Sequence, residues 1–504
     1  MKFFMLITNK EFKMNNSIIK HMFLFFLSIS FVFSAQVYGK KISVLTMTGP
    51  FISGPVKVHG EEWGKKTGHQ VEVVEAAFSD IFPKVQQAAA IRSDAFDLLL
   101  VANIWMADMV GWNYVIPLDK YIKDPAVQYD LDVPSGIKRK NTFNEKTYGL
   151  IADNDNHYLF YRKDILGNPE YQLKFGKKYG YTYNVPPRTI DELIDVAEFF
   201  NNWDWDNDGK NEYGFVRSTK RGAQTYWYSF SWAAPYTVIP NFSIDTPGIM
   251  FFDPNTMKPL VNTPGFVKGI EKWYEMGQRG TAPGLDWDRG NVINEIILGN
   301  AAMAIDWGDI GPSTYKSESV VQGKIGYALP PGSNEYWDWR TNKWVKTKTI
   351  NRAPVHCFNG WSWFITSTSS NPDIAADFMK YMLSPEVSSV DVASPDSGYQ
   401  PWRNSQLEGL ENWEKNGWER SDAQAYLQNT IDVTNAPNAV IDMRIPGASN
   451  YSEAIYETYL TTILSGENSV QQAMDIVAKE WESLTERLGR DKQIEFYKWH
   501  LNYR

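Results

Sequence analysis

The fold is decided by three apolar runs, Lys41-Ile-Ser-Val-Leu45, Gln70-Val-Glu-Val-Val-Glu75 and Asp97-Leu-Leu-Leu-Val101. Each has the length and composition of a β-strand, and the third is apolar throughout, as in a strand that is buried on both faces. Residues 56–66 and 81–90, which lie between these runs, have the pattern of helices. The order strand, helix, strand, helix, strand predicts a parallel sheet with crossover helices, and therefore an α/β fold.

Later segments carry the start signals of helices. Thr189 and Glu192 have the spacing of a capping box ahead of a short amphipathic run. A helix is also expected at 373–382, where a proline stands at the first helical position. Ser469 and Gln472 repeat the capping spacing ahead of a long apolar stripe. We interpret these stripes as core-facing surfaces.

Residues 1–39 have the pattern of a secretory signal peptide. Lys13 and Lys20 precede the apolar run 22–33, which is too short to span a membrane but suits the apolar region of a signal. Small residues near position 39 suit cleavage, so we expect the mature chain to begin at Lys40. The protein is therefore expected in the periplasm.

Charge and cysteine usage exclude several classes of partner and anchor. The 504 residues include 59 acidic and 50 basic side chains, a net charge of −9, which argues against nucleic acid as a partner. The single cysteine, Cys357, lies far from the signal. It is therefore neither a lipidation site at the start of a mature chain nor half of an internal disulfide.

Aromatic residues are unusually frequent. The chain contains 20 Trp and 27 Tyr residues. One interpretation is a large aromatic core, since Trp is highly buried on average. The other is a groove whose rings stack on a flat ligand such as a sugar. The sequence leaves both open.

The segment Asp204-Trp-Asp-Asn-Asp-Gly-Lys-Asn-Glu212 has the pattern of a calcium loop. Carboxylates alternate ahead of a glycine, and hard cations such as Ca²⁺ require oxygen ligands at such spacing. The twelfth position is Phe215, so the bidentate Glu of an EF-hand is missing; an acidic surface turn is the alternative. We predict a structural Ca²⁺ bound by Asp204, Asp206, Asp208, the backbone carbonyl of Lys210, and Glu212.

Several segments, in order, resemble the extracellular solute-binding proteins that serve ABC sugar importers, of the maltose-binding type. This chain looks like a long member with an inserted calcium-like loop. The segments that carry the resemblance are Phe78-Ser-Asp-Ile-Phe-Pro-Lys84, Trp105-Met-Ala-Asp108, Tyr158-Leu-Phe-Tyr-Arg-Lys-Asp164, Leu298-Gly-Asn-Ala-Ala-Met-Ala-Ile-Asp-Trp307, Gly360-Trp-Ser-Trp-Phe-Ile-Thr366 and Ala375-Ala-Asp-Phe-Met-Lys-Tyr-Met-Leu-Ser-Pro-Glu386.

The resemblance implies an α/β, two-lobe periplasmic-binding-protein fold with hinge strands and a ligand cleft between the lobes. It places 40–152 and 307–382 in an N-terminal lobe, and 153–306 and 383–504 in a C-terminal lobe. It also implies a monomer that closes on a sugar or oligosaccharide and delivers it to ABC importer permease subunits.

The resemblance and the residue chemistry together select candidate ligand residues near the lobe crossings. Rings would stack on pyranose faces while carboxylates, amides and guanidinium groups bond hydroxyls. For each Trp, core packing is an open alternative, and Asp108 and Asp309 have the alternative role of helix caps. The candidates are Asp80, Trp105, Asp108, Asn156, His157, Trp307, Asp309, Trp361, Tyr399, Trp402 and Arg403.

Enzymatic motifs are absent from the sequence. There is no Gly-x-Ser-x-Gly, His-Glu-x-x-His or phosphate loop, and His356 beside Cys357 is not a nucleophile pair, because neighbouring strand residues point to opposite faces. We therefore expect a binding protein without catalytic activity. The alternative is a secreted calcium-dependent polysaccharide lyase or glycoside hydrolase. The two catalytic carboxylates of a hydrolase meet in space and follow no fixed spacing in the sequence. A surface glycan-binding protein that feeds an outer-membrane channel is a third possibility.

Overall fold

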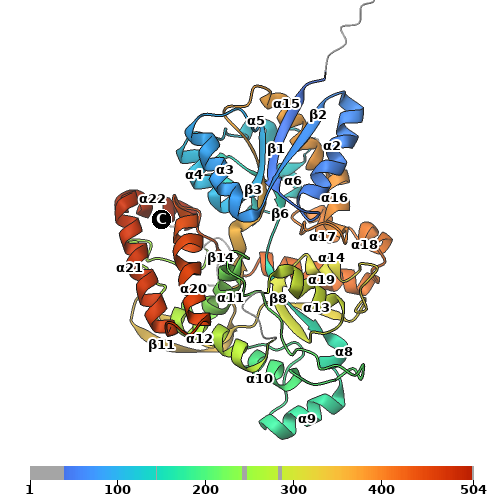
Figure 1. Ribbon diagram of the computed structural model, residues 1–504, viewed down its shortest axis with the longest axis vertical. Helices are drawn as coiled ribbons and strands as arrows, with labels where there is room; N and C mark the ends of the chain where they lie inside the picture. The colour runs from blue at the N-terminus through green and yellow to red at the C-terminus, as the bar shows by residue number, and fades with distance from the viewer. Residues whose placement is uncertain (1–38, 126, 144, 241–246, 282–286, 502–504) are drawn as a thin grey trace, which may run out of the picture.

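The protein has two lobes, one above the other in Figure 1. The computed structural model describes residues 39–125, 127–143, 145–240, 247–281 and 287–501. The predicted signal peptide lies outside the described residues, except for its last position. The two-lobe α/β architecture that the sequence predicts is confirmed.

The upper lobe is built on a five-stranded sheet. Its spatial order is β2 (Gln70–Ala76), β1 (Lys41–Met47), β3 (Leu98–Ala102), β13 (Trp361–Ile365) and β6 (Leu150–Asp153). β1 pairs in parallel with β2 and β3, so the predicted parallel unit is confirmed. β13 runs antiparallel to both of its neighbours. Every residue of β3 is buried, as its unbroken apolar run predicts.

Helices cover the upper sheet. The two predicted crossover helices are confirmed as α2 (Ser53–Thr67) and α3 (Phe78–Ala90). The predicted helix after Asn371 is confirmed as α15 (Pro372–Met382), whose Phe378 packs on Trp63 and Trp363. Shorter elements of this lobe are η1 (Asn103–Trp105), α4 (Met106–Gly111), α5 (Asp119–Ile122), α6 (Tyr129–Asp132), α7 (Ser135–Lys140), β4 (Thr142–Phe143), β5 (Lys146–Thr147) and α16 (Pro385–Ala393).

The lower lobe contains a three-stranded antiparallel sheet. β7 (His157–Arg162) lies at its centre, between β8 (Met303–Trp307) and β9 (Ile325–Ala328). A second pair of strands, β10 (Ser333–Asp338) and β11 (Lys343–Asn351), forms a hairpin beside α11 and α12. The helices are α8 (Lys163–Leu166), α9 (Pro169–Tyr179), α10 (Ile190–Phe200), α11 (Thr225–Thr237), α12 (Pro264–Arg279), α13 (Arg289–Ile297), α14 (Ile310–Ser313), α18 (Glu411–Lys415) and α19 (Arg420–Thr434).

The structure places two segments in lobes other than those expected from the sequence. Residues 307–351 were assigned to the N-terminal lobe, but β9 pairs with β7 and therefore lies in the lower sheet. Residues 385–393 were assigned to the C-terminal lobe, but α16 packs against α2, where Asp391 lies 2.9 Å from His59 Nε2. Both differences arise because strand pairing and helix packing join residues far apart in sequence.

The chain ends in a group of helices that contacts both lobes (Figure 1). It comprises η3 (Asn450–Tyr456), α20 (Glu457–Leu464), α21 (Val470–Leu488) and α22 (Arg490–Leu501). α21 packs on the lower lobe through Trp481 and Phe252, whose ring centroids are 5.0 Å apart. α22 reaches the upper lobe, where Phe496 lies 5.3 Å from Phe143. None of the helices in the described part of the chain is long and apolar enough to cross a membrane.

The capping signals behave differently at two helices. The box that opens α21 is complete, with Ser469 Oγ accepting from Gln472 N and Gln472 Oε1 accepting from Ser469 N. At α10 only Thr189 takes part, because the Glu192 carboxylate accepts from the backbone N–H groups of Asn184 and Arg188 instead. The predicted start of each helix is confirmed.

Candidate interlobe binding site

Three crossings of the chain join the lobes. The first runs from β6 to β7, and the second from β11 to β13 through β12 (Val355–His356) and η2 (Cys357–Asn359). The third follows α16 and leads to α17 (Asn404–Glu408). Gln400 on the third crossing donates its N–H to Asp153 Oδ1 at 2.8 Å and its side-chain amide to Asp155 Oδ1 at 2.9 Å. The first and third crossings are therefore held together directly.

An aromatic cluster, here called the interlobe cluster, lies where the lobes meet. Its rings are contiguous: centroid distances are 5.1 Å for Trp307–Phe358, 4.8 Å for Trp227–Phe358 and 5.7 Å for Phe78–Trp227. It joins residues of α3, β13 and η1 above to residues of α11 and β8 below. Its members are Phe78, Trp105, Trp227, Trp307, Phe358 and Trp361.

Three predicted ligand residues therefore meet in one place. Trp105, Trp307 and Trp361 come from different crossings or lobe edges, as the sequence predicts. Phe78 and Trp227 were not predicted, although Phe78 lies in a segment that carries the family resemblance. Phe358 has a φ of 35°, in the left-handed region that is unusual for an aromatic residue. This conformation belongs to the second crossing, where the chain turns from β12 into β13.

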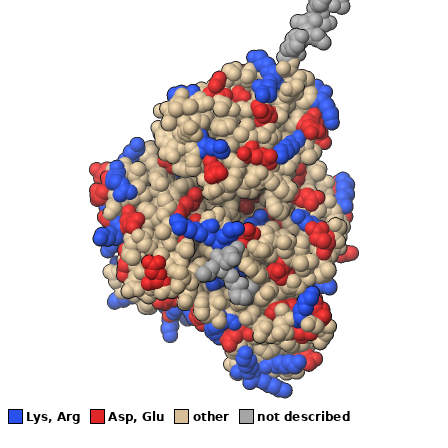
Figure 2. Space-filling model, viewed as in Figure 1, with Lys and Arg blue, Asp and Glu red and all other residues tan. Residues whose placement is uncertain are grey.

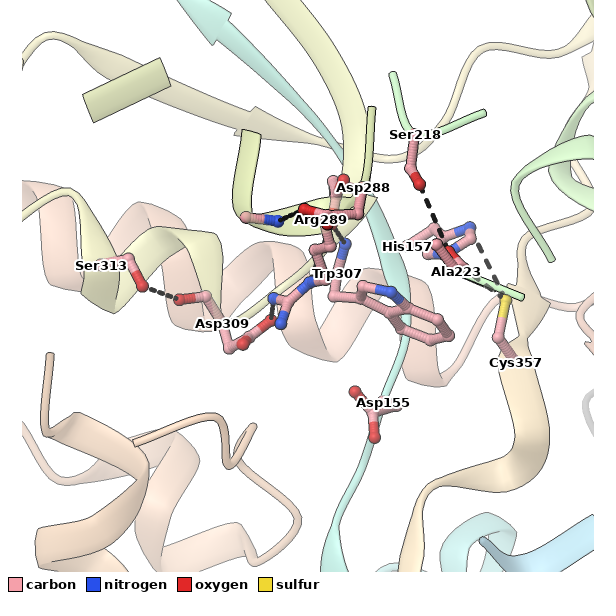
Figure 3. Close-up of polar contacts among 12 residues, drawn as sticks. Asp155, His157, Ser218, Ala223, Asp288, Arg289, Trp307, Asp309, Ser313 and Cys357 are labelled. Atoms are coloured by element: carbon pink, nitrogen blue, oxygen red, sulfur yellow. Dashed lines mark hydrogen bonds and ion pairs between the residues drawn. The ribbon is translucent and has the colours of Figure 1, made fainter. Parts of the chain in front are cut away.

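Arg289 and Asp309 lie beside Trp307 in Figure 3, and Asp306 directly precedes Trp307 in the chain. Arg289, at the start of α13, forms an ion pair with Asp309 and lies 3.3 Å from Asp306 Oδ1. Burial raises the pKa of Asp306 to about 6, although Arg289 opposes the shift. The two carboxylates raise the pKa of the Arg289 guanidinium and outweigh its burial, so it stays charged. Asp309 was predicted; Arg289 and Asp306 were not.

Asp155 contributes a third carboxylate to the site. It lies below the Trp307 indole in Figure 3, and its pKa is raised by burial, with the nearby Asp309 charge adding to the effect. Its carboxyl shares a hydrogen bond with the carboxyl of Asp153, whose pKa is also raised by burial. The sequence pointed to its neighbours Asn156 and His157. Asn156 instead donates its amide to the carbonyl of Asn154 at 2.7 Å.

His157 and Cys357 lie side by side, to the right of the Trp307 indole in Figure 3. Cys357 Sγ is 3.6 Å from His157 Nδ1, which also lies 2.8 Å from Ser231 Oγ. Burial lowers the pKa of His157 to about 3 and raises the pKa of the Cys357 thiol well above its usual range. Both groups are therefore neutral near pH 7, which does not suit a thiolate nucleophile. His356 is directed to the carbonyl of Val433, 3.2 Å away.

The upper and lower lobes are bonded at the other end of the cluster. Trp105 Nε1 donates to Ser449 Oγ at 2.7 Å, and Gly447 N donates to Asp108 Oδ1 at 3.0 Å. Two predicted ligand residues thus contact the segment ahead of η3. Burial raises the pKa of Asp108 to about 7. On the lower side, Trp227 Nε1 donates to Asp442, which also accepts from Phe358 N.

The remaining predicted ligand residues lie away from the interlobe cluster. Tyr399 is buried, and its hydroxyl donates to the carbonyl of Ile52 at 3.1 Å. Trp402 stacks under the Arg403 guanidinium, which pairs with Asp132 of α6 at 3.3 Å. These contacts are those of core residues, the alternative that the sequence left open for Trp. Asp80 is exposed in the first turn of α3.

The acidic loop at 204–212 forms the geometry expected of a cation site. Carboxylate oxygens of Asp204, Asp206, Asp208 and Glu212 all lie within 4.8 Å of one another. Gly209 has a φ of 91°, so the turn needs its glycine. Burial raises the pKa of Glu212, even though Trp205 N donates to its carboxylate, and the neighbouring aspartates add to the effect. This donor set fits a hard divalent cation.

The surface is hollowed at the junction of the lobes, as Figure 2 shows. Lys and Arg side chains gather along the lower edge of this hollow. Two exposed bases of the loop ahead of α11 have acidic neighbours: Lys220 lies 3.5 Å from Asp288, and the Arg221 charge acts on Glu457. The interlobe cluster and its carboxylates are buried.

Known proteins resemble the chain in sequence and in fold. A probable ABC transporter-binding protein of Deinococcus radiodurans is 25% identical over 330 residues, covering 65% of this chain and 68% of the relative. Among solved structures, a solute-binding protein of Agrobacterium radiobacter K84 in complex with ribitol is 18% identical, with a TM-score of 0.67 over 88% of this chain and 99% of the other. Maltose-bound MalE3 of T. maritima is 18% identical, with a TM-score of 0.66 over 88% of this chain and 100% of the other.

A family model settles the wider relationship. The model of the bacterial extracellular solute-binding proteins matches residues 60–417, which include most of both lobes and all three crossings. The match confirms the family that the ordered segments of the sequence resemble. The chain belongs to the bacterial extracellular solute-binding proteins.

Proposed function

We propose that the protein is the binding component of an ABC importer, which captures a sugar or oligosaccharide between its lobes and delivers it to the permease in the membrane. The observation that carries this proposal is the interlobe cluster, where six aromatic rings and several buried polar groups meet at the crossings. Indole rings stack on the apolar faces of pyranoses, and carboxylates accept hydrogen bonds from hydroxyls.

The relatives support the ligand class. The solved structures that match this fold include proteins bound to ribitol, D-mannitol and maltose, all of them polyhydroxylated. Trp307 and Trp227 of the lower lobe and Trp105 and Trp361 of the upper lobe would then stack on the ligand. Asp155 and Arg289 would bind its hydroxyl groups. Hinge motion at the crossings would open the site for entry.

The family and the site both favour binding over catalysis. Asp306 and Asp309 are both paired with Arg289, so these two carboxyls serve a structural ion pair. His157 and Cys357 are both neutral. We therefore propose that the bound saccharide leaves unchanged.

Calorimetry on the purified protein tests this function. We expect a panel of polyols, disaccharides and oligosaccharides to include a ligand that binds one to one, with no new product in the recovered solution by chromatography. Cleavage of the bound glycan would favour the hydrolase or lyase. Binding of peptides alone would overturn the ligand class.

We also propose that the loop at 204–212 holds a structural Ca²⁺. The ion would offset the repulsion among Asp204, Asp206, Asp208 and Glu212, with the Lys210 carbonyl as a further ligand. At a calcium concentration 100-fold above the dissociation constant, the ion stabilises the fold by about 2.7 kcal/mol. Chelation should therefore lower the melting temperature, and added Ca²⁺ should restore it. Asp206→Asn should weaken this response, while Glu467→Gln, an exposed control in another loop, should keep it.

We propose that the protein acts in the periplasm as a monomer. The support is the signal pattern of the sequence together with the extracellular family. Fractionation of producing cells and light scattering on the mature protein test both points. A cytoplasmic pool or a stable dimer would contradict them.

A further inference from the structure

The charged groups that touch the interlobe cluster are mostly acidic. Asp306 accepts from the backbone N–H of Trp307, and Asp442 accepts from Trp227. Glu453 accepts from Ser449, the partner of Trp105. Asp155, Asp309 and Asp108 complete the set. Carboxylates therefore border the cluster from both lobes and from the first crossing.

Arg289 is the arginine that faces these acids. Its charge acts on Asp155, Asp306 and His157, and the Lys140 charge also acts on Asp155. Its guanidinium is already paired with Asp306 and Asp309. A ligand carboxylate would have to displace these partners, which leaves buried charges without a counterion and costs several kcal/mol.

Other buried bases near the crossings direct their donors to the protein. Lys140 Nζ donates to Asn154 Oδ1 at 2.8 Å, and burial lowers its pKa to about 7. Arg444 donates to the carbonyls of Arg139, at 3.0 Å, and of Lys140, at the end of α7. To neutralise an anionic ligand, Lys140 would have to leave Asn154 on the first crossing, and Arg444 would have to break the contact between α7 and the C-terminal segment.

The site also has buried polar atoms that require particular partners. Asn156 Oδ1 is an acceptor and Trp307 Nε1 is a donor, and neither has a partner among the described residues. The Asp155 carboxyl is bonded to that of Asp153. A buried acceptor that lacks a donor costs about 1–3 kcal/mol, so a ligand that supplies hydroxyl donors recovers this energy. A carboxylate group in place of a ligand hydroxyl supplies no donor at that position and adds repulsion against the six acids.

We propose that the interlobe site selects an uncharged polyhydroxylated saccharide and rejects the uronic acid of the same skeleton. Asn156 Oδ1 accepts a ligand hydroxyl, Trp307 Nε1 donates to a ligand oxygen, and the surrounding carboxylates, Asp155 among them, set the discrimination. This inference deepens the proposed function and rests on it, because it concerns the charge of the ligand in the same site.

Matched pairs of ligands test the charge preference. Cellobiose with cellobiouronic acid, galactobiose with digalacturonic acid, and D-mannitol with D-mannonate differ in charge while keeping most of the skeleton. Titration calorimetry at pH 7.5 should find that any pair that binds does so through its neutral member, with the acid weaker by about 100-fold or more, as one unfavourable buried charge predicts. An acid that binds as tightly as its neutral partner overturns the inference and leaves the proposed function intact.

Failure of the proposed saccharide function would give a different result from failure of the charge preference. If no member of any pair binds, and a wider glycan panel is also negative, the proposed saccharide function fails and this inference fails with it. If a neutral ligand binds, the Asp155→Asn variant tests the source of the preference. Removal of one carboxylate charge should reduce the preference for the neutral member by about tenfold. Glu467→Gln, remote and exposed, should leave the preference unchanged. An unchanged preference in Asp155→Asn would remove Asp155 from the discriminating set.

Discussion

The interlobe cluster and the aromatic cluster under α21 are built from the same residue types, yet they treat their polar atoms differently. In the C-terminal cluster of Phe252, Tyr451, Trp481 and Tyr497, Trp481 Nε1 donates to the carbonyl of Tyr451 at 2.8 Å. The Tyr451 hydroxyl lies 2.8 Å from Thr485 Oγ1. In the interlobe cluster, Trp307 Nε1 has no partner in the described part of the chain.

The difference teaches how to separate packing from binding when burial is equal. Trp481 and Trp307 are both almost fully buried, at 0% and 2% exposure, so accessibility does not distinguish them. Partner satisfaction alone does not, because Trp402 Nε1, which packs in the core, also lacks a partner among the described residues. Position does: the C-terminal cluster joins α21 and α22 to Phe252 of the lower lobe, whereas the interlobe cluster spans both lobes.

The largest expected effect breaks the C-terminal cluster. Trp481→Ala should destabilise the protein by about 3–5 kcal/mol, because it leaves a large cavity and the Tyr451 carbonyl without its donor. Urea denaturation followed by circular dichroism measures the change. The folded fraction should bind ligand with unchanged affinity. Loss of affinity in the folded fraction would mean that the two clusters are coupled.

A second substitution breaks the interlobe cluster. Trp307→Ala should weaken saccharide binding by about 10- to 100-fold, since a stacked ring contributes roughly 1–3 kcal/mol. Trp307→Phe keeps a ring and should recover part of the affinity. Calorimetry on the same ligand compares the two. Equal affinity in Trp307→Ala and the native protein would place the ligand elsewhere.

The pH dependence of stability also bears on the comparison between the two aromatic clusters, because buried acids surround the interlobe cluster. Burial raises the pKa of Asp108 to about 7, so the folded state binds its proton more tightly than the unfolded state. Its contribution to stability is full below about pH 4 and is lost as pH rises through 7, with a slope of up to about 1.4 kcal/mol per pH unit.

The test of this slope uses a variant that keeps the hydrogen bond. Asp108→Asn still accepts from Gly447 N but does not titrate, so its melting temperature should fall less between pH 5 and pH 8 than that of the native protein. Glu467→Gln serves as the exposed control. Parallel melting curves for native protein and Asp108→Asn across this range would contradict the assignment.

The smallest expected effect concerns one bond between the lobes. Ser449→Ala removes the acceptor of Trp105 Nε1 and should destabilise the unliganded protein by about 1 kcal/mol. Ser449→Thr retains a hydroxyl and should restore most of this loss. Thermal melting of the three proteins at one pH provides the measurement. A gain in stability for Ser449→Ala would show that this contact is strained.

Much of the fold follows from local patterns in the sequence. The β1–α2–β2–α3–β3 unit is confirmed because each element has its own periodicity and its order restricts the topology. The ordered family segments are confirmed by the family model over 60–417. The lobe boundaries are harder to predict from the sequence, because β9 joins the lower sheet only through its pairing with β7.

The site was predicted in part. Trp105, Trp307, Asp309 and Trp361 lie at the interlobe cluster, at or just beyond the ends of β3, β8 and β13. Tyr399, Trp402 and Arg403 look the same in sequence but pack in the core. Arg289, Asp442 and Phe358 carried no local signal, since each acts only beside residues from distant segments. For Asp155, the nearest predictions fell one and two residues away.

By itself, the sequence determined the parallel αβ unit, the helix starts, the acidic loop and the family, because these depend on residues close together in the chain. Only the tertiary structure decided which aromatic residues meet between the lobes and which carboxylates surround them. It also decided that His157, rather than His356, lies beside Cys357. The physical reason is that packing, burial and charge pairing act through space, and residues 200 positions apart in the sequence can lie within van der Waals contact.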